Sequence, residues 1–165
     1  MTFAGELGEA APASRTSNLD PNVSDLVIRE VWDEVNFETV LQLRDDVFVH
    51  EQQLTDDART DPDDIKSIHF LALRADDPVG TGRLTMHGRE AQVAWVAVRA
   101  ADRGTGIGLA IMEAIIERAF EESAGYVMLN AQTHAIEFYR RLGFEVVGTE
   151  FFMGGIGHFV MMLRF

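Results

Sequence analysis

The sequence predicts an α+β domain, in which a mixed and mostly antiparallel sheet has helices on both of its faces. Three apolar, β-branched runs follow one another across short turns between residues 68 and 98, as in an antiparallel meander. A helical segment precedes this meander, and two more alternate with strands after it. The resulting order, β-α-β-β-β-α-β-α-β-β, is typical of domains whose helices cover a single sheet.

Each expected element follows from its periodicity and from its flanking residues. The expected strands cover residues 25–31, 68–74, 79–86, 91–98, 125–130, 144–152 and 158–165. Asn36 is expected to cap the first helix, whose apolar positions recur from Phe37 to Phe48. The second helix is expected over residues 109–122 and the third over 133–142, where Gly143 stands at the usual helix-ending position.

The length of 165 residues is enough for one domain with a full core. Residues 1–22 are rich in Ala, Ser, Gly and Pro without periodicity, so we expect a flexible tail before a single domain at 23–165. No apolar run approaches the ~20 residues that cross a bilayer, and no secretory signal pattern is present. Cysteine is absent, which excludes disulfides and thiolate ligands. These features predict a cytoplasmic protein.

The charge balance is strongly acidic, with a formal net charge of −13 and Lys66 as the single lysine. Such a surface repels nucleic acids and anionic membranes, so neither is expected as a partner. Glu113, Glu117 and Glu121 lie four residues apart on one helical ridge, where like charges repel at low salt. Because molar salt screens this repulsion, one hypothesis is a host with a salty cytoplasm, and the alternative is an ordinary acidic protein.

The most informative motif is the glycine-rich stretch at residues 103–108, between the strand at 91–98 and the second helix. Glycines at 104, 106 and 108 allow an anion to approach the main chain, and the N-terminus of a helix offers unpaired N–H groups. Arg103 can add a charge-assisted contact. The motif therefore predicts a pyrophosphate site. A dinucleotide motif is the alternative, but that motif belongs early in a parallel βαβ unit.

Three motifs in order resemble the GNAT superfamily of acyl-CoA-dependent N-acetyltransferases. They are Val96-x-Val98, Arg103-x-x-Gly106-x-Gly108 and Ala135-x-x-Phe138-Tyr139-x-x-x-Gly143-Phe144, and the resemblance runs from about residue 25 to the end. Within the superfamily, residues 44–52, Ala131-Gln132 and Gly155-Ile-Gly-His158 resemble the ElaA-type branch. The resemblance implies the GNAT fold and acetyl-CoA as cosubstrate.

The resemblance also implies roles for individual residues. Main-chain groups of Val96 and Val98 would bind the pantetheine arm, and an N–H near Val96 would stabilise the oxyanion. Tyr139 would donate a proton to the leaving thiolate, a phenol of pKa near 10 facing a thiol of pKa near 8.5. Gln132 stands where many members carry Asn, so its coenzyme contact has a different reach. The pyrophosphate would be held by Arg103, Gly104, Thr105, Gly106, Ile107 and Gly108.

The sequence gives several candidates for the residues that would bind or deprotonate the acceptor amine. Glu51 follows an apolar run at the end of the first helix, where desolvation would favour a general base, and the alternative is a solvated charge. Asp61 and Asp64 either bind a cationic amine or solvate their loop. His158 follows a glycine-rich loop that could close over the acceptor. His69, between two apolar residues, is expected to be structural.

No metal is expected, because the five histidines show no metal-ligand spacing. The predicted activity is acetyl transfer from acetyl-CoA to a primary amine by direct attack in a ternary complex. The alternatives are a coenzyme A-binding regulatory module without turnover and transfer of a longer acyl chain. Pairing through the C-terminal strands would give a homodimer.

Overall fold

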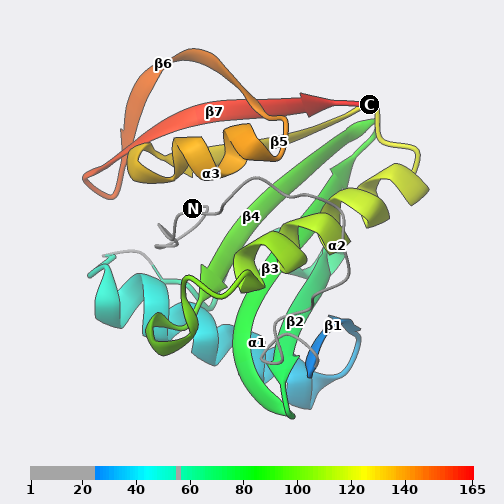
Figure 1. The fold of residues 1–165 in the computed structure, drawn as a ribbon, viewed down its shortest axis with the longest axis vertical. Coiled ribbons are helices and arrows are strands. Elements are labelled where there is room, and N and C mark those ends of the chain that lie inside the picture. Colours follow the sequence, from blue (N-terminus) through cyan, green and yellow to red (C-terminus); the bar gives the residue numbers. More distant parts are fainter. Residues whose placement is uncertain (1–24, 55–56) are drawn as a thin grey trace.

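A computed structural model describes residues 25–54 and 57–165. The tail expected at residues 1–22 lies outside the described residues. Seven strands form one sheet in the order β1-β2-β3-β4-β5-β7-β6, and only the β4–β5 pair is parallel (Figure 1). The strands are β1 (Leu26–Val31), β2 (Ile68–Arg74), β3 (Asp77–His87), β4 (Glu90–Val98), β5 (Tyr126–Gln132), β6 (Glu145–Met153) and β7 (Ile156–Arg164). The predicted fold class and element order are confirmed.

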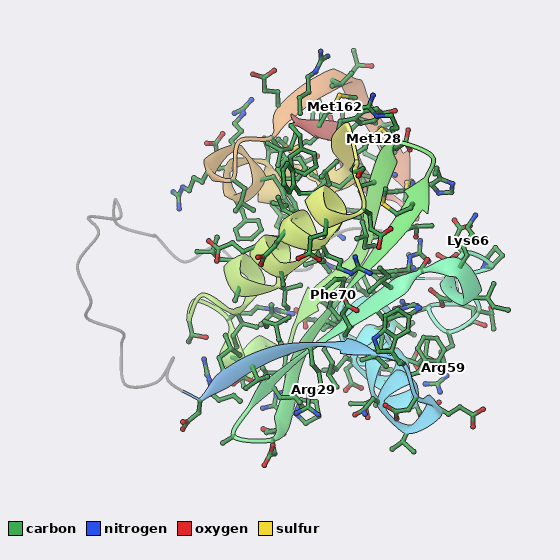
Figure 2. The ribbon with its side chains drawn as sticks, turned by 90° about the vertical axis from the view of Figure 1, so that its right-hand side faces the viewer. Arg29, Arg59, Lys66, Phe70, Met128 and Met162 are labelled. Atoms are coloured by element: carbon green, nitrogen blue, oxygen red, sulfur yellow. The ribbon has the colours of Figure 1, made fainter. Side chains whose placement is uncertain are left out.

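Helices cover both faces of this sheet. Helix α1 (Glu34–Arg44) continues into a π-helical segment, η1 (Asp45–Glu51), and packs on one face. Helix α2 (Ile107–Glu121) and the short α3 (Ile136–Arg141) pack on the other, where the main core lies. Figure 2 shows Phe70 of β2 between the sheet and α2. The sheet is thus buried on both sides at its centre.

The start of α1 differs from the prediction. The N-cap is Asp33, whose Oδ1 accepts a hydrogen bond from the Asn36 amide at 2.9 Å. Asn36 is thus the third residue of the helix, and its amide is capped by Asp33. The first helix therefore begins one turn sooner than predicted.

Two glycines of β3 set the distance between the sheet and α2. A Cβ at Gly80 would lie 2.8 Å from Ile111 Cδ1, and a Cβ at Gly82 would lie 2.8 Å from Ile115 Cδ1. Both values are below ordinary van der Waals contact. The absence of side chains at these positions lets α2 lie close to β3, and this fixes where the N-terminus of α2 meets the end of β4.

Candidate active site

The sheet divides between its two parallel strands. Strands β4 and β5 pair from Glu90↔Tyr126 to Val93↔Leu129, and among the described residues no further pair joins them. Figure 1 shows β5 diverging from β4 beyond this point. After Val93, β4 still pairs with β3 but has no paired strand on its β5 side, and we call this opening the gap. The coenzyme contacts expected of Val96 and Val98 at the gap stay a prediction.

A β-bulge in β4 lies at the start of this division. Thr81 pairs with Ala97 and Arg83 with Ala94, so two residues of β4, Trp95 and Val96, stand opposite one of β3. Trp95 adopts a φ of +54°, which is uncommon for a bulky residue and strained. Bulges bend a strand and change the direction of its main-chain groups. This bulge begins two residues after Val93, the last β4 residue that pairs with β5.

The side chain of Trp95 is held on the α1 face by several contacts. Its Nε1 donates to Asp61 Oδ2 at 2.8 Å, and the ring of Phe48 meets it edge to face at 5.1 Å. The guanidinium of Arg44 lies 5.2 Å from the indole centroid, a cation–π arrangement. Burial alone would raise the pKa of Asp61, but hydrogen bonds from Trp95 and the Asp63 amide, with the charge of Arg83, lower it. These contacts stabilise the strained bulge.

Asp64, predicted to contact the acceptor, belongs to the same network and also lines a hollow between β1, α1 and residues 59–69, so its substrate role stays a prediction. Its Oδ2 accepts from Arg44 at 2.8 Å and its Oδ1 from Arg83 at 2.9 Å. Arg83 also contacts Asp61 at 2.8 Å. Both arginines are buried, and a buried guanidinium needs a carboxylate partner. The two aspartates of the acidic loop therefore neutralise two arginines inside the fold.

His69 has the structural role that was predicted for it. Arg44 Nη2 donates to His69 Nδ1 at 3.1 Å, and His69 Nε2 donates to the Asp64 carbonyl at 2.9 Å. Burial lowers the pKa of His69, which favours this neutral form.

The glycine-rich loop joins β4 to α2 at the mouth of the gap. Gly104 and Gly106 have φ values of +74° and +85°, and Gly106 is the N-cap of α2. An added Cβ at either glycine would meet no atom within 4 Å, so the loop surface is open to an approaching ligand. Thr105 Oγ1 donates to the Asp102 carbonyl at 2.6 Å and closes the turn. Ile107 is fully buried and anchors the first turn of α2 in the core.

The end of η1 contacts both sides of the gap. Glu51 forms a two-point ion pair with Arg103, with Nη2 to Oε2 at 2.7 Å, while Arg103 Nε donates to the Val98 carbonyl at 3.0 Å. Gln52 and Gln132 exchange amide hydrogen bonds of 3.1 and 2.9 Å. Of the two settings considered for Glu51, the structure has the solvated one, because its side chain is 40% exposed and bound to an arginine.

Tyr139 lies on the α2 face of the sheet, opposite the face that α1 covers, and is the most deeply buried residue of α3. Its ring contacts those of Phe138 and Phe144 edge to face, at centroid distances of 5.0 and 5.8 Å. Phe138 and Leu142 of the same segment are only partly buried. Burial raises the pKa of Tyr139 well above its usual 10, so the phenol is neutral at physiological pH.

His158 lies in β7, as expected, and β7 begins two residues earlier than predicted, at Ile156. It stands opposite Gln132 in the β5–β7 pair and stacks against Phe151 at 5.8 Å. Its Nδ1 donates to the Ile156 carbonyl at 2.7 Å, and burial lowers its pKa. The strand fixes the position of this ring, and its role at the acceptor site stays a prediction.

A cavity of about 390 Å³ lies on the α1 face beside the bulge. Its walls come from the loop after η1, from β4 and from the β6–β7 turn, and they include Leu54, Asp57, Thr60, Trp95, Met153 and Gly154. A larger hollow of about 520 Å³ lies between β1, α1 and residues 59–69, and none of the residues predicted for the coenzyme line it. The smaller cavity is the one that adjoins the bulge at Trp95.

A mixed sheet split between two parallel strands, with a glycine loop and a helix N-terminus at the opening, defines the fold of an acyl-CoA-dependent acyltransferase. The chain belongs to the GNAT family, since the model of the acetyltransferase (GNAT) domain matches residues 31–165. It is therefore an enzyme of the N-acetyltransferase class.

Individual relatives agree with this assignment. The uncharacterized N-acetyltransferase YjcF of Bacillus subtilis is 34% identical over 121 residues, which cover 73% of this chain and 86% of YjcF. The crystal structure of Escherichia coli ElaA has a TM-score of 0.76 at 26% identity, over 83% of this chain and 98% of ElaA. An acyl-CoA N-acyltransferase from Pseudomonas aeruginosa has a TM-score of 0.75 at 27% identity, over 84% and 97% of the two chains.

Sequence reasoning missed several residues that build this site. Arg44 and Arg83 hold the acidic loop, and both interrupt otherwise apolar patterns, which is the signal for a buried ion pair. The bulge at Trp95 and the partnership of Gln52 with Gln132 carry no local signal. Both depend on segments that are distant in the chain.

In the described part of the chain, no helix is long and apolar enough to span a bilayer.

Proposed function

We propose that this enzyme transfers an acetyl group from acetyl-CoA to a primary amine by direct attack in a ternary complex. The observation that carries the proposal is the position of the β4 bulge. It lies between a glycine loop suited to a diphosphate and a cavity that reaches the same main-chain segment from the α1 face. Two ligands could thus meet at the Val96 amide from different directions.

The residues present fit the coenzyme. Open space above Gly104 and Gly106 admits phosphate oxygens to the main chain, and the first turn of α2 adds N–H donors and its positive dipole end. Val96 and Val98 offer main-chain groups along the gap, and Gln132 would contact the coenzyme from β5 through the second N–H of its amide, since the first donates to Gln52. Acetyl-CoA supplies the acetyl group as an activated thioester.

Three groups of this chain would act on the reacting atoms. The Val96 N–H would donate to the oxyanion that forms at the thioester carbonyl. Tyr139 would donate a hydrogen bond to the leaving sulfur, and its raised pKa keeps it in the donor form. Complete proton transfer from it is less favourable than a pKa of 10 would allow, so hydrogen bonding is the role that burial supports. Glu51 would take the amine proton once it has left Arg103.

The amine would enter through the 390 Å³ cavity. Asp57 on its wall accepts hydrogen bonds from Thr60 and the Arg59 amide, which lower its pKa and keep it ionised. A second carboxylate, that of Asp61, and the apolar side chains of Leu54, Trp95 and Met153 also line the cavity. A negative charge beside an apolar wall suits an amine that carries a positive charge away from the reacting nitrogen.

Thiol release from acetyl-CoA with a panel of primary amines tests the proposal. We expect amine-dependent release by the wild type and a lower kcat with nearly unchanged coenzyme affinity for Tyr139→Phe, because that change removes one hydroxyl from the core. Tight coenzyme binding without release for any amine would contradict turnover. That result would instead favour a coenzyme A-binding regulatory module, for which the occupied Arg103 is the supporting observation.

A further inference from the structure

We infer that Glu51 competes with the coenzyme diphosphate for Arg103, so that coenzyme binding itself releases the Glu51 carboxylate into the gap. This inference depends on the proposed function, because it assumes that the loop at 103–108 binds the diphosphate. It assigns Gln52, a residue with no predicted role, as the positioning residue of the same turn.

All the guanidinium nitrogens of Arg103 have partners within the chain. Its Nε is engaged with the Val98 carbonyl at 3.0 Å, and both terminal nitrogens face the carboxylate of Glu51. The two-point geometry is the one in which a guanidinium also binds a phosphate. A diphosphate arriving at the loop therefore meets an arginine whose matching edge is taken by a carboxylate.

The electrostatics decide which anion remains. Glu51 carries one negative charge, and a coenzyme diphosphate carries two and gains main-chain donors from the α2 N-terminus besides. The Arg103–Glu51 pair is partly exposed, with exposed fractions of 19% and 40%. A pair this exposed contributes only about 0.2–1 kcal/mol, so a diphosphate can displace the carboxylate.

The neighbouring Gln52 holds the turn while Glu51 moves. Its two hydrogen bonds with Gln132 join neutral amides, and Gln132 is fully buried at the end of β5. Because neither amide is charged, an incoming anion does not displace one from the other. The main chain at residues 51–52 therefore stays near the opening of the gap, and only the Glu51 side chain has to rotate away from Arg103.

Calorimetric titration of the full chain with coenzyme A tests this exchange. We expect Glu51→Gln to bind about 1.4- to fivefold more tightly than wild type, the factor that corresponds to the energy of the exposed ion pair. Glu122→Gln is the matched control. Glu122 is 39% exposed and pairs with Arg118 at 2.6 Å beyond the opposite end of α2, so its substitution removes the same charge and should leave the affinity unchanged.

A double-mutant cycle separates direct competition from a general charge effect. In an Arg103→Met background, the gain from Glu51→Gln should disappear, because the shared partner is gone. An unchanged or weaker affinity in Glu51→Gln, or an equal gain in both backgrounds, would overturn the inference. Absence of any binding by the folded wild type would contradict the proposed function itself.

Kinetics give a second readout that a merely structural role would not produce. Glu51→Gln should lower the KM for acetyl-CoA while lowering kcat, because the same carboxylate both competes for Arg103 and takes the amine proton. A parallel loss of coenzyme affinity and kcat, with an unchanged thermal midpoint, would contradict the competition.

Discussion

Substitution of Gly106 by alanine separates the energy of the backbone from the binding of the coenzyme. Gly106 has a φ of +85° and a ψ of 8°, and a Cβ there would meet no atom within 4 Å. The folded protein therefore suffers no clash, only the conformational cost of an L-residue in the left-handed region, about 1–2 kcal/mol. For a domain of this size, that cost lowers the thermal midpoint by about 2–8 °C.

The effect of Gly106→Ala on binding should be larger than its effect on stability. The new methyl group points into the space where a phosphate would approach the main chain. Loss of one hydrogen bond to a charged group costs about 1.5–3 kcal/mol, which corresponds to about a 10- to 150-fold weaker affinity for coenzyme A. Titration calorimetry measures the affinity, and a thermal melt of the same sample measures the stability.

Gly88→Ala is the matched control. Gly88 lies in the β3–β4 turn with a φ of +61° and equally open surroundings, so it should lose similar stability and keep its affinity. Wild-type affinity in Gly106→Ala would refute the reasoning about the loop. An equal loss of affinity in both variants would show that backbone strain, and not access to the loop, controls binding.

Three further predictions concern packing, charge and pH. Gly80→Ala places a methyl group 2.9 Å from the Ala97 carbonyl oxygen and should lower the free energy of unfolding by about 1–3 kcal/mol in urea. Asp64→Asn leaves two buried arginines short of a countercharge and should cost about 3–5 kcal/mol, whereas Asp63→Asn, at a partly exposed pair, should cost much less. Burial lowers the pKa of His69, so the unfolded chain binds its proton first, and stability should fall as the pH drops below about 6.5.

Each of these predictions has a result that would contradict it. An unchanged urea midpoint in Gly80→Ala would mean that α2 can move away from the sheet at no cost. Equal losses of unfolding free energy in Asp64→Asn and Asp63→Asn would show that the buried network does not stabilise the fold. A thermal midpoint that rises as the pH is lowered from 7 to 5.5 would contradict the sign expected from His69. The carboxylates with lowered pKa values destabilise the fold only when they are protonated, which happens at more acidic pH.

The order of elements and the glycine loop could be predicted because their signals are local. Apolar periodicity identifies each strand and helix within a few residues, and Gly106 stands directly between a strand and a helix. The chemistry of an anion site follows from that juxtaposition alone. The resemblance to the GNAT superfamily added the roles of Val96 and Tyr139, which no local pattern contains.

The acceptor side could not be predicted in the same way, because it is built from contacts between distant segments. Asp64 lies 20 residues from Arg44 and 19 from Arg83, and its acidic loop looks solvated until those buried arginines are placed. Glu51 meets Arg103 across 52 residues. A carboxylate's availability depends on such partners, so the general base was the least predictable part of the site.

The central claim is that residues 103–108 bind a diphosphate while the gap between β4 and β5 receives the thioester arm. Backbone amide chemical shifts of the isotope-labelled chain, titrated with coenzyme A, test it most directly. We predict that the shifts concentrate at residues 103–108, Val96 and Val98. Shifts confined to the hollow formed by β1, α1 and residues 59–69, or no shifts at saturating coenzyme, would contradict it.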